Sequence, residues 1–233
     1  GPSPQDWDDA ALPVGIEELR FPSGNLHLKA WIGKPEERRP RMPVVIFLHG
    51  GFAFGADDFE MASPYRRAGF VVVTPILRGE NGQAGNFSMF YDEVADVLAL
   101  ADFVRHQPYV DPARIFLAGH SAGATLALLA DMATSVPFAR VATFSASPDQ
   151  ILFTNGPPWN QIVPFDATNP REFELRSPLA YATSLKSPTR LYFGSQEVFF
   201  RETTRRLVGI AKQASLDVEY KVMDGDHFTA VPA

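Results

Sequence analysis

The alternation of apolar and polar positions divides the chain into candidate strands and helices. Short continuous apolar runs rich in β-branched residues are typical of strands buried on both faces of a sheet. Such runs lie at 44–48, 70–74, 115–118, 141–145, 189–193 and 218–223. Two further strand candidates, 17–21 and 26–33, flank the turn Ser23-Gly24-Asn25, which predicts a hairpin.

Helical patterns separate these runs. The stretch 57–68 has Asp57 as its N-cap candidate and Gly69 as its stop signal, and a basic amphipathic helix is predicted over 201–214. From Ser88 onward, apolar residues recur on one helical face. The acidic residues off that face are expected to be exposed to solvent: Asp92, Glu93, Asp96 and Asp102.

Because strands and helices alternate from residue 44, the pattern predicts an α/β fold with a mostly parallel, eight-stranded sheet and helices on both faces. We expect a single domain over 1–233. Residues 1–13, acidic and proline-bearing, are predicted to form a loose N-terminal arm, and the long irregular stretch 147–188 a lid-like insertion.

Composition limits the classes of function. Over 233 residues, the 45 % apolar and 21 % charged fractions are typical of a soluble globular protein with a substantial core. The net charge is −6, with basic pairs at Arg38-Arg39 and Arg205-Arg206 but no larger basic cluster, so we expect no nucleic-acid partner. No apolar run approaches the roughly 18 residues of a membrane span.

The chain contains no cysteine, which excludes disulfides, thiolate metal sites and a cysteine nucleophile. The histidines lack the spacing typical of metal ligands, and the sequence has neither a Gly-x-Gly-x-x-Gly motif nor a P-loop. It therefore predicts neither metal nor cofactor. The sequence begins with Gly1-Pro2 rather than Met, which resembles the residues left after removal of a tag. The sequence leaves open whether the protein is cytoplasmic or secreted, and it leaves the oligomeric state open.

One motif carries chemistry directly. Gly119-His120-Ser121-Ala122-Gly123 follows an apolar strand candidate and opens at once into an alanine-rich helical pattern. A strand, a sharp turn and a helix are the context in which a Gly-x-Ser-x-Gly exposes a nucleophilic serine. We therefore predict Ser121 as a nucleophile, with the Ala122 amide, at the helix N-terminus, positioned for an oxyanion.

A serine nucleophile needs a base that titrates near neutrality, which favours histidine. Of the five histidines, His227 follows the last strand candidate and completes the chain order serine, acid, histidine. His49 is expected to order the glycine-rich turn that it opens, and His120 to point away from the serine.

The third member must be a carboxylate that orients the imidazole. Glu197 follows the strand candidate 189–193, and Asp149, just past the preceding strand, is the alternative acid. Asp224 and Asp226 are close to His227 in sequence and are expected to shape its turn.

The turn after the first buried strand supplies the second oxyanion donor. In His49-Gly50-Gly51-Phe52, the Phe52 amide is the first candidate and the Gly51 amide the second. Aromatic residues near this turn and in the insertion are predicted to wall a substrate pocket: Phe52, Phe54, Trp159 and Phe165. An apolar wall suits an uncharged acyl chain.

From Phe21 to His227 the chain resembles the α/β-hydrolase superfamily, specifically the prolyl-oligopeptidase catalytic domain and dienelactone-hydrolase branch with its esterase relatives. The resemblance is carried by the serine motif and by His49-Gly50-Gly51, Leu77-Arg78-Gly79, Val110-Asp111-Pro112-Ala113-Arg114-Ile115, Arg176-Ser177-Pro178-Leu179, Ser187-Pro188-Thr189 and Gly194. It implies ester or amide hydrolysis through an acyl-enzyme, with Ser121 as nucleophile, His227 as base and residue 197 as acid.

The sequence departs from that branch in several features. Glu197 stands where the family usually has Asp, the nucleophile is serine rather than the cysteine of dienelactone hydrolases, and a β-propeller is absent. Six residues follow His227, where relatives carry a further helix, so a less anchored histidine loop is expected. We predict a carboxylesterase acting on small-molecule, short-chain acyl esters. The alternatives are a serine peptidase or aminopeptidase of the prolyl-oligopeptidase type, or a non-catalytic binding protein of the same fold.

Overall fold

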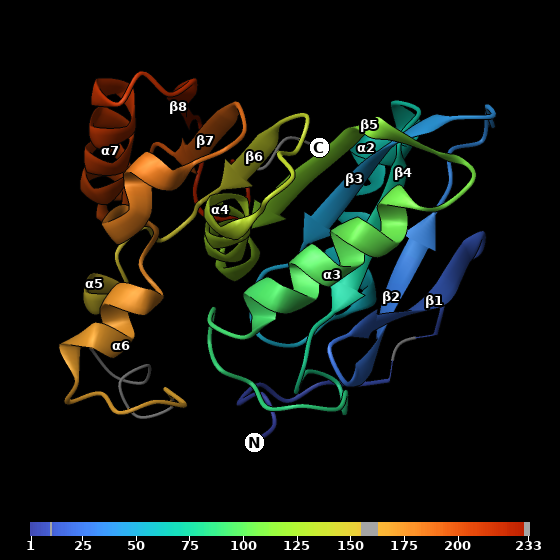
Figure 1. The fold of residues 1–233 in the computed structure, drawn as a ribbon, viewed down its shortest axis with the longest axis horizontal. Coiled ribbons are helices and arrows are strands. Elements are labelled where there is room, and N and C mark those ends of the chain that lie inside the picture. The colour runs from blue at the N-terminus through green and yellow to red at the C-terminus, as the bar shows by residue number, and fades with distance from the viewer. Residues whose placement is uncertain (10, 155–162, 231–233) are drawn as a thin grey trace.

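A computed structural model describes residues 1–9, 11–154 and 163–230. Its centre is an eight-stranded sheet with the strand order β1-β2-β4-β3-β5-β6-β7-β8 (Figure 1). The strands are β1 (Ile16–Ser23), β2 (Leu26–Gly33), β3 (Met42–Leu48), β4 (Val71–Ile76), β5 (Val110–His120), β6 (Val141–Phe144), β7 (Thr189–Gly194) and β8 (Val218–Met223). β1 and β2 form an antiparallel hairpin that joins β4, and the pairs from β4 to β8 are parallel.

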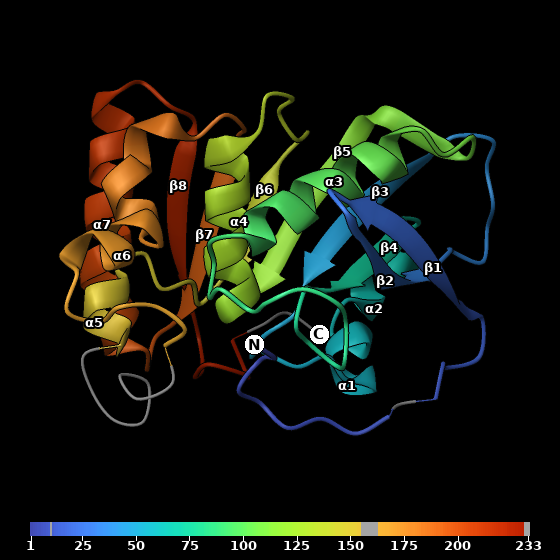
Figure 2. The ribbon, with the colours of Figure 1, turned by 60° about the horizontal axis from the view of Figure 1, so that its bottom comes forward.

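Helices cover both faces of the sheet. They are α1 (Ala56–Glu60), α2 (Ser63–Arg67), α3 (Glu93–Arg105), α4 (Ala122–Ala133), α5 (Gln150–Thr154), α6 (Pro170–Leu175) and α7 (Val198–Gln213), with a 3₁₀ helix at Pro178–Ser184. α3, α4 and α7 lie side by side on one face (Figure 2). In β3, Val44 and Ile46 pack with the α3 and α4 side, whereas Val45 and Phe47 pack with Phe59 of α1. The predicted fold class is confirmed.

Two predicted helices differ in extent. The single helix expected over 57–68 is α1 followed by α2, because Pro64 lies in the first turn of α2, where its missing N–H is tolerated. The helix expected from Ser88 begins at Glu93. The Glu93 carboxylate accepts hydrogen bonds from the amides of Ser88 (2.6 Å) and Tyr91 (3.1 Å), which hold the preceding residues in a turn.

The expected exposure of the acidic residues on α3 is wrong for two of the four. Asp92 and Asp102 are exposed, but Glu93 and Asp96 are buried. Asp96 accepts hydrogen bonds from Ser23 Oγ (2.5 Å) and from the Arg78 guanidinium (2.7 and 2.9 Å). A buried carboxylate is stable only when it is paired in this way, and helical periodicity does not reveal the partners. In the described part of the chain, no helix is long and apolar enough to cross a membrane.

Candidate active site

The sharp turn between β5 and α4 holds Ser121. Its backbone has φ 54° and ψ −117°, a conformation outside the regions that most L-residues adopt. Two glycines permit this turn. A Cβ on Gly119 would lie 2.4 Å from the Gly123 carbonyl oxygen, and one on Gly123 would lie 2.2 Å from the Leu48 carbonyl oxygen. Their small size lets α4 pack directly on the ends of β3 and β5, with the serine at the tip of the turn.

A chain of hydrogen bonds connects Ser121, His227 and Glu197. Ser121 Oγ lies 2.9 Å from His227 Nε2, and His227 Nδ1 lies 2.6 Å from Glu197 Oε1. With the proton on Nδ1, the ring donates to the carboxylate and accepts from the serine hydroxyl. The three residues come from the ends of β5, β8 and β7, which the parallel sheet brings to one edge.

Glu197 is held on both carboxylate oxygens. Its Oε2 accepts from Ser145 Oγ (2.6 Å) and from the Gly194 amide (2.6 Å), while Oε1 faces His227. Burial by itself raises the pKa of Glu197, but the hydrogen bonds from His227, Ser145 and Gly194 outweigh it and hold the pKa below its usual value. The carboxylate is therefore ionised at neutral pH. Ser145 directly follows β6, and no local pattern in the sequence marks it as part of the site.

The loop that carries His227 is fixed from two sides. Asp226 Oδ1 accepts from the amides of Phe228 (3.0 Å) and Thr229 (2.9 Å), so Asp226 shapes the turn as expected. These hydrogen bonds lower the pKa of Asp226 to about 2.

His120 contacts the same loop. His120 Nε2 lies 2.8 Å from the His227 carbonyl oxygen, and the two rings are 4.8 Å apart. Burial lowers the pKa of His120, which keeps its ring neutral. His120 thus contacts the backbone of the histidine loop, a role that its sequence position did not indicate.

Ala122 and Phe52 carry the first two candidate oxyanion-donor amides. The Ala122 amide opens α4, and no hydrogen bond within the described ranges engages it. The Phe52 amide donates to Gln5 Oε1 at 2.8 Å. The N-terminal segment is held there by a hydrogen bond from Ser3 Oγ to the Phe52 carbonyl and by one from the Ser3 amide to the Gly79 carbonyl (2.8 Å). The predicted loose arm therefore places a side-chain carbonyl on the first oxyanion-donor candidate.

A buried ion pair anchors the glycine-rich turn. His49 and Glu80 are 4 % and 3 % exposed, and His49 Nε2 lies 3.1 Å from Glu80 Oε2. Burial lowers the pKa of His49, but the Glu80 carboxylate and, more weakly, Asp58 outweigh it and raise the pKa to about 9. His49 Nδ1 lies 2.9 Å from the Gly50 carbonyl oxygen, so both ring nitrogens donate, as an imidazolium requires. The pair orders the turn, which is the role expected of His49.

Gly51 and Asp149 are the next two predicted site residues. Gly51 has φ 68°, and a Cβ there would meet Gln5 Oε1 at 2.7 Å. Asp149 Oδ1 accepts from the Ile151 amide (3.0 Å), whereas the carboxylate on His227 is that of Glu197.

The predicted pocket aromatics divide into three groups. Phe52 lines a cavity of ≈ 20 Å³ next to Ala122, with Phe87 and Phe90. Phe54 packs edge-on against Trp31 (4.8 Å) and is buried in the core, and Phe165 lies 4.1 Å from the Arg176 guanidinium, so neither lines this cavity. Trp159 lies outside the described residues. Among the described side chains, no three His, Asp or Glu residues are grouped as metal ligands.

The chain matches a known protein family and several solved structures. The Alpha/beta hydrolase family model matches residues 45–230. The curated proteins contain no match to the chain. Similar solved structures include the acylaminoacyl peptidase of Pyrococcus horikoshii, with 21% identity and a TM-score of 0.78 over 92% of this chain and 38% of that one.

A puromycin-hydrolyzing peptidase of Mycobacterium tuberculosis has 22% identity and a TM-score of 0.80 over 93% of this chain and 38% of that one. A thermophilic esterase of Thermogutta terrifontis, titled as propionate-bound, has 22% identity and a TM-score of 0.71 over 92% of this chain and 85% of that one. The chain thus spans 38% of the two peptidases. At these identities the likeness establishes the fold.

Proposed function

The chain belongs to the alpha/beta hydrolase family, and we propose that it is a serine carboxylesterase that cleaves short-chain acyl esters through an acyl-enzyme. The observation that carries the proposal is the unbroken hydrogen-bond chain from Ser121 Oγ through His227 to Glu197. A serine hydroxyl becomes a competent nucleophile when a neutral imidazole accepts its proton and a carboxylate holds that imidazole.

In the proposed mechanism, Ser121 Oγ attacks the ester carbonyl carbon while His227 Nε2 takes the hydroxyl proton. The carbonyl oxygen becomes an oxyanion that the Ala122 and Phe52 amides stabilise. His227 then donates the proton to the departing alcohol oxygen, leaving the acyl group on Ser121. Water, deprotonated by the same imidazole, releases the acid. Glu197 stays ionised and stabilises the imidazolium.

Two features support a short acyl group and an uncharged ester. The cavity beside Ala122 measures ≈ 20 Å³, room for about one water, and aromatic rings wall it. The rings of Phe200 (5.9 Å) and Phe228 (5.1 Å) lie beside the His227 ring, and Phe228 is 68% exposed. Apolar surroundings favour a substrate without charge near the reacting carbonyl.

The carboxylates near the cavity argue against an aminopeptidase. Such an enzyme must hold a substrate ammonium, and Glu80 and Glu93 line the cavity. Glu80 is paired with His49, and both oxygens of Glu93 accept hydrogen bonds from Ser88. Neither carboxylate is available without breaking buried contacts, which supports an ester over a peptide amine as substrate.

The test is hydrolysis of p-nitrophenyl esters from C2 to C12 by the full chain and by Ser121→Ala. We expect turnover that is highest at short acyl lengths and lost in the variant. Turnover by Ser121→Ala equal to that of the unchanged chain would defeat the mechanism. Hydrolysis of aminoacyl amides without hydrolysis of esters would instead favour the peptidase alternative.

A further inference from the structure

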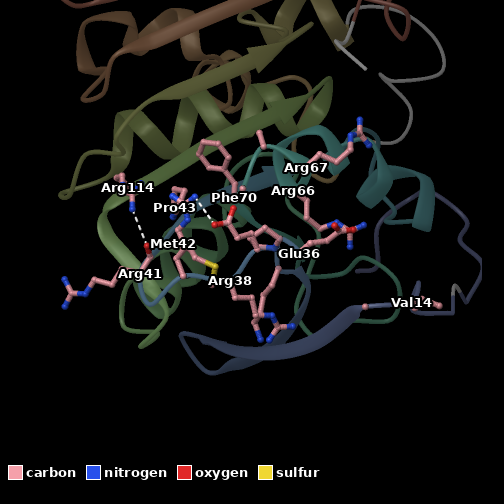
Figure 3. A pocket seen from close by; sticks show the side chains of 17 residues that line it. Val14, Glu36, Arg38, Arg41, Met42, Pro43, Arg66, Arg67, Phe70 and Arg114 are labelled. Carbon is pink, nitrogen blue, oxygen red and sulfur yellow. Dashed lines mark hydrogen bonds and ion pairs between the residues drawn. The ribbon is translucent and has the colours of Figure 1, made fainter.

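A second cavity lies at the opposite edge of the sheet. It measures ≈ 1000 Å³ and is lined by the connector before β3, by the end of α2 and by the first part of β5 (Figure 3). Apolar surface is contributed by Met42, which begins β3, and by Phe70, which directly precedes β4. Its volume is at the upper end of the range typical of small-molecule sites.

The lining of this cavity is strongly cationic. Seven of its side chains are basic, Lys34 and six arginines, and only Glu36 and Glu37 are acidic. The cavity therefore carries an excess of five positive charges in a chain whose net charge is −6. Such segregation of like charge produces a local positive potential that attracts anions.

The arginines come from three elements. Arg38, Arg39 and Arg41 come from the connector, Arg66 and Arg67 from the last turn of α2, and Arg114 from β5 (Figure 3). Their sequence positions span 77 residues, so only the tertiary fold brings them together.

Carboxylates of the chain neutralise only part of this charge. Lys34 pairs with Glu17 (3.3 Å), Arg39 with Glu37 (3.2 Å) and Arg114 with Asp111 (2.7 Å). The remaining four guanidiniums make no ion pair with any residue in the described ranges: Arg38, Arg41, Arg66 and Arg67. Arg67 donates only to the neutral Ser63 hydroxyl, at 2.8 Å. Four planar, permanently charged donors in the lining thus have no carboxylate of the described residues within ion-pair distance.

We propose that this arginine-lined cavity is a binding site for a small molecule that carries several phosphate groups. A guanidinium matches phosphate oxygens with two parallel N–H donors, and four unpaired guanidiniums suit a ligand of several negative charges. The lining lies at the amino ends of β3, β4 and β5, whereas Ser121, Glu197 and His227 follow the carboxyl ends of strands. About 20 Å of strand separates these edges, so the ligand binds without occupying the ester site.

The test is calorimetric titration of inorganic tripolyphosphate into the full chain. We expect one site per chain at about 50 mM NaCl, with affinity that falls several-fold at about 300 mM NaCl because salt screens the charges. Arg41→Glu/Arg67→Glu, two exposed positions from different elements, should weaken binding about tenfold or more. The milder pair Arg41→Gln/Arg67→Gln should also weaken binding and guards against misfolding of the charge-reversed variant.

Arg205→Glu/Arg206→Glu on α7 is the matched control, because it changes the net charge equally at exposed positions outside the cavity. This variant should bind like the unchanged chain. An equal loss of affinity in this control, or no binding by the unchanged chain at low salt, would overturn the site. Equally tight binding of citrate, a tricarboxylate, would overturn the assignment to phosphate. Competition between tripolyphosphate and an ester substrate would overturn the separation of this cavity from the ester site.

Discussion

At the scale of single residues, the geometry around Glu197 depends on partners from neighbouring strands. The longer arm of glutamate, compared with aspartate, has one more rotatable bond to fix. Ser145 and the Gly194 amide fix it by occupying Oε2, which leaves Oε1 for His227. Ser145 is 2% exposed and has φ 58°, so its hydroxyl is directed at the carboxylate by a constrained backbone.

Replacing Ser145 by Ala tests this positioning role. Hydrogen bonds to a charged group contribute about 1.5–3 kcal/mol, so we expect kcat on a p-nitrophenyl ester to fall roughly tenfold or more, with little change in KM. The buried Ser147, whose hydroxyl lies 3.3 Å from the Asp149 carbonyl, is the matched control. A kcat for Ser145→Ala no lower than that of Ser147→Ala would contradict the role.

The His49–Glu80 pair predicts a pH-dependent stability. The folded-state pKa of His49, about 9, lies above the unfolded value of 6.5, so the protonated ring stabilises the fold fully below about pH 6.5 and this contribution is lost as the pH rises through 9. Glu80→Gln should lower stability by about 3–5 kcal/mol at neutral pH, because it leaves a buried charge unpaired. Urea denaturation from pH 7 to pH 10 should show the difference shrinking.

Glu60→Gln is the control for this measurement, since Glu60 is exposed at the end of α1. It should track the unchanged chain at every pH. A constant difference between the unchanged chain and Glu80→Gln across the range would mean that His49 does not titrate there.

At the scale of elements, close packing of α4 against the sheet positions the serine. Gly119 and Gly123 lie where backbone atoms of β3 and α4 approach too closely for any side chain. The same contact orients the first turn of α4, with the Ala122 amide, beside the glycine-rich turn. The proposed nucleophile and one proposed oxyanion donor are therefore positioned by one helix–strand contact.

Gly123→Ala should disturb that contact. A Cβ 2.2 Å from a backbone oxygen cannot be accommodated by rotating a side chain. We therefore expect the free energy of unfolding to fall by a few kcal/mol and most of the ester hydrolysis to be lost. Gly209 gives the opposite case, because it is exposed within α7 and a Cβ there would point into open space. Gly209→Ala should stabilise by about 0.5–1 kcal/mol through helix propensity and leave activity unchanged. Thermal or urea denaturation measures the change in stability of both variants, and p-nitrophenyl ester hydrolysis measures their activity.

The N-terminal segment is the second element at the site. Gln5 Oε1 occupies the Phe52 amide that the proposed mechanism needs for the oxyanion. If that amide must be released before reaction, Gln5→Ala should raise kcat/KM for short esters about two- to tenfold, as expected for one hydrogen bond of net 0.5–1.5 kcal/mol. Asp6→Ala, at the next exposed position, should have no effect. A kcat/KM that stays constant or falls in Gln5→Ala would show that the contact does not compete with substrate.

At the scale of the whole molecule, the parallel sheet separates two groups of polar side chains. The carboxyl ends of β5, β7 and β8 collect the serine, glutamate and histidine, and the opposite edge collects the arginines of the second cavity. The antiparallel hairpin β1–β2 is tied to this sheet through Asp96 of α3, which contacts Ser23 at the hairpin turn and Arg78 after β4. This contact holds three segments that are distant in sequence.

Asp96→Ala should therefore destabilise the whole fold. Asp96 is fully buried, and removing it leaves Arg78 without its main partner, so we expect a loss of about 3–5 kcal/mol in urea denaturation. Asp102→Ala, on the same helix with its side chain 72% exposed, should change stability by less than about 0.5 kcal/mol. Equal stability of the two variants would contradict the proposed tie.

The strand runs and the serine motif could be predicted because their signals are local. Continuous β-branched runs identify the strands, and small residues on both sides of Ser121 identify the sharp turn. The ends of β2 and β8 agree with the predicted ranges. The pattern before β4 predicts one helix, whereas the structure has two. Pro64 could be read as an interior residue of one helix or as the start of a second, and the packing of α2 decides between these readings.

The sequence by itself determined the alternation of strands and helices, and with it the parallel sheet and the edge at which Ser121, Glu197 and His227 meet, because short-range periodicity dictates these features. Only the tertiary structure decided which polar residues are buried and paired. Asp96, the His49–Glu80 pair, Ser145 against Glu197, Gln5 on the Phe52 amide and the arginine-lined cavity all join residues far apart in the chain. Such contacts depend on which elements pack together, and no local pattern of apolar and polar residues encodes them.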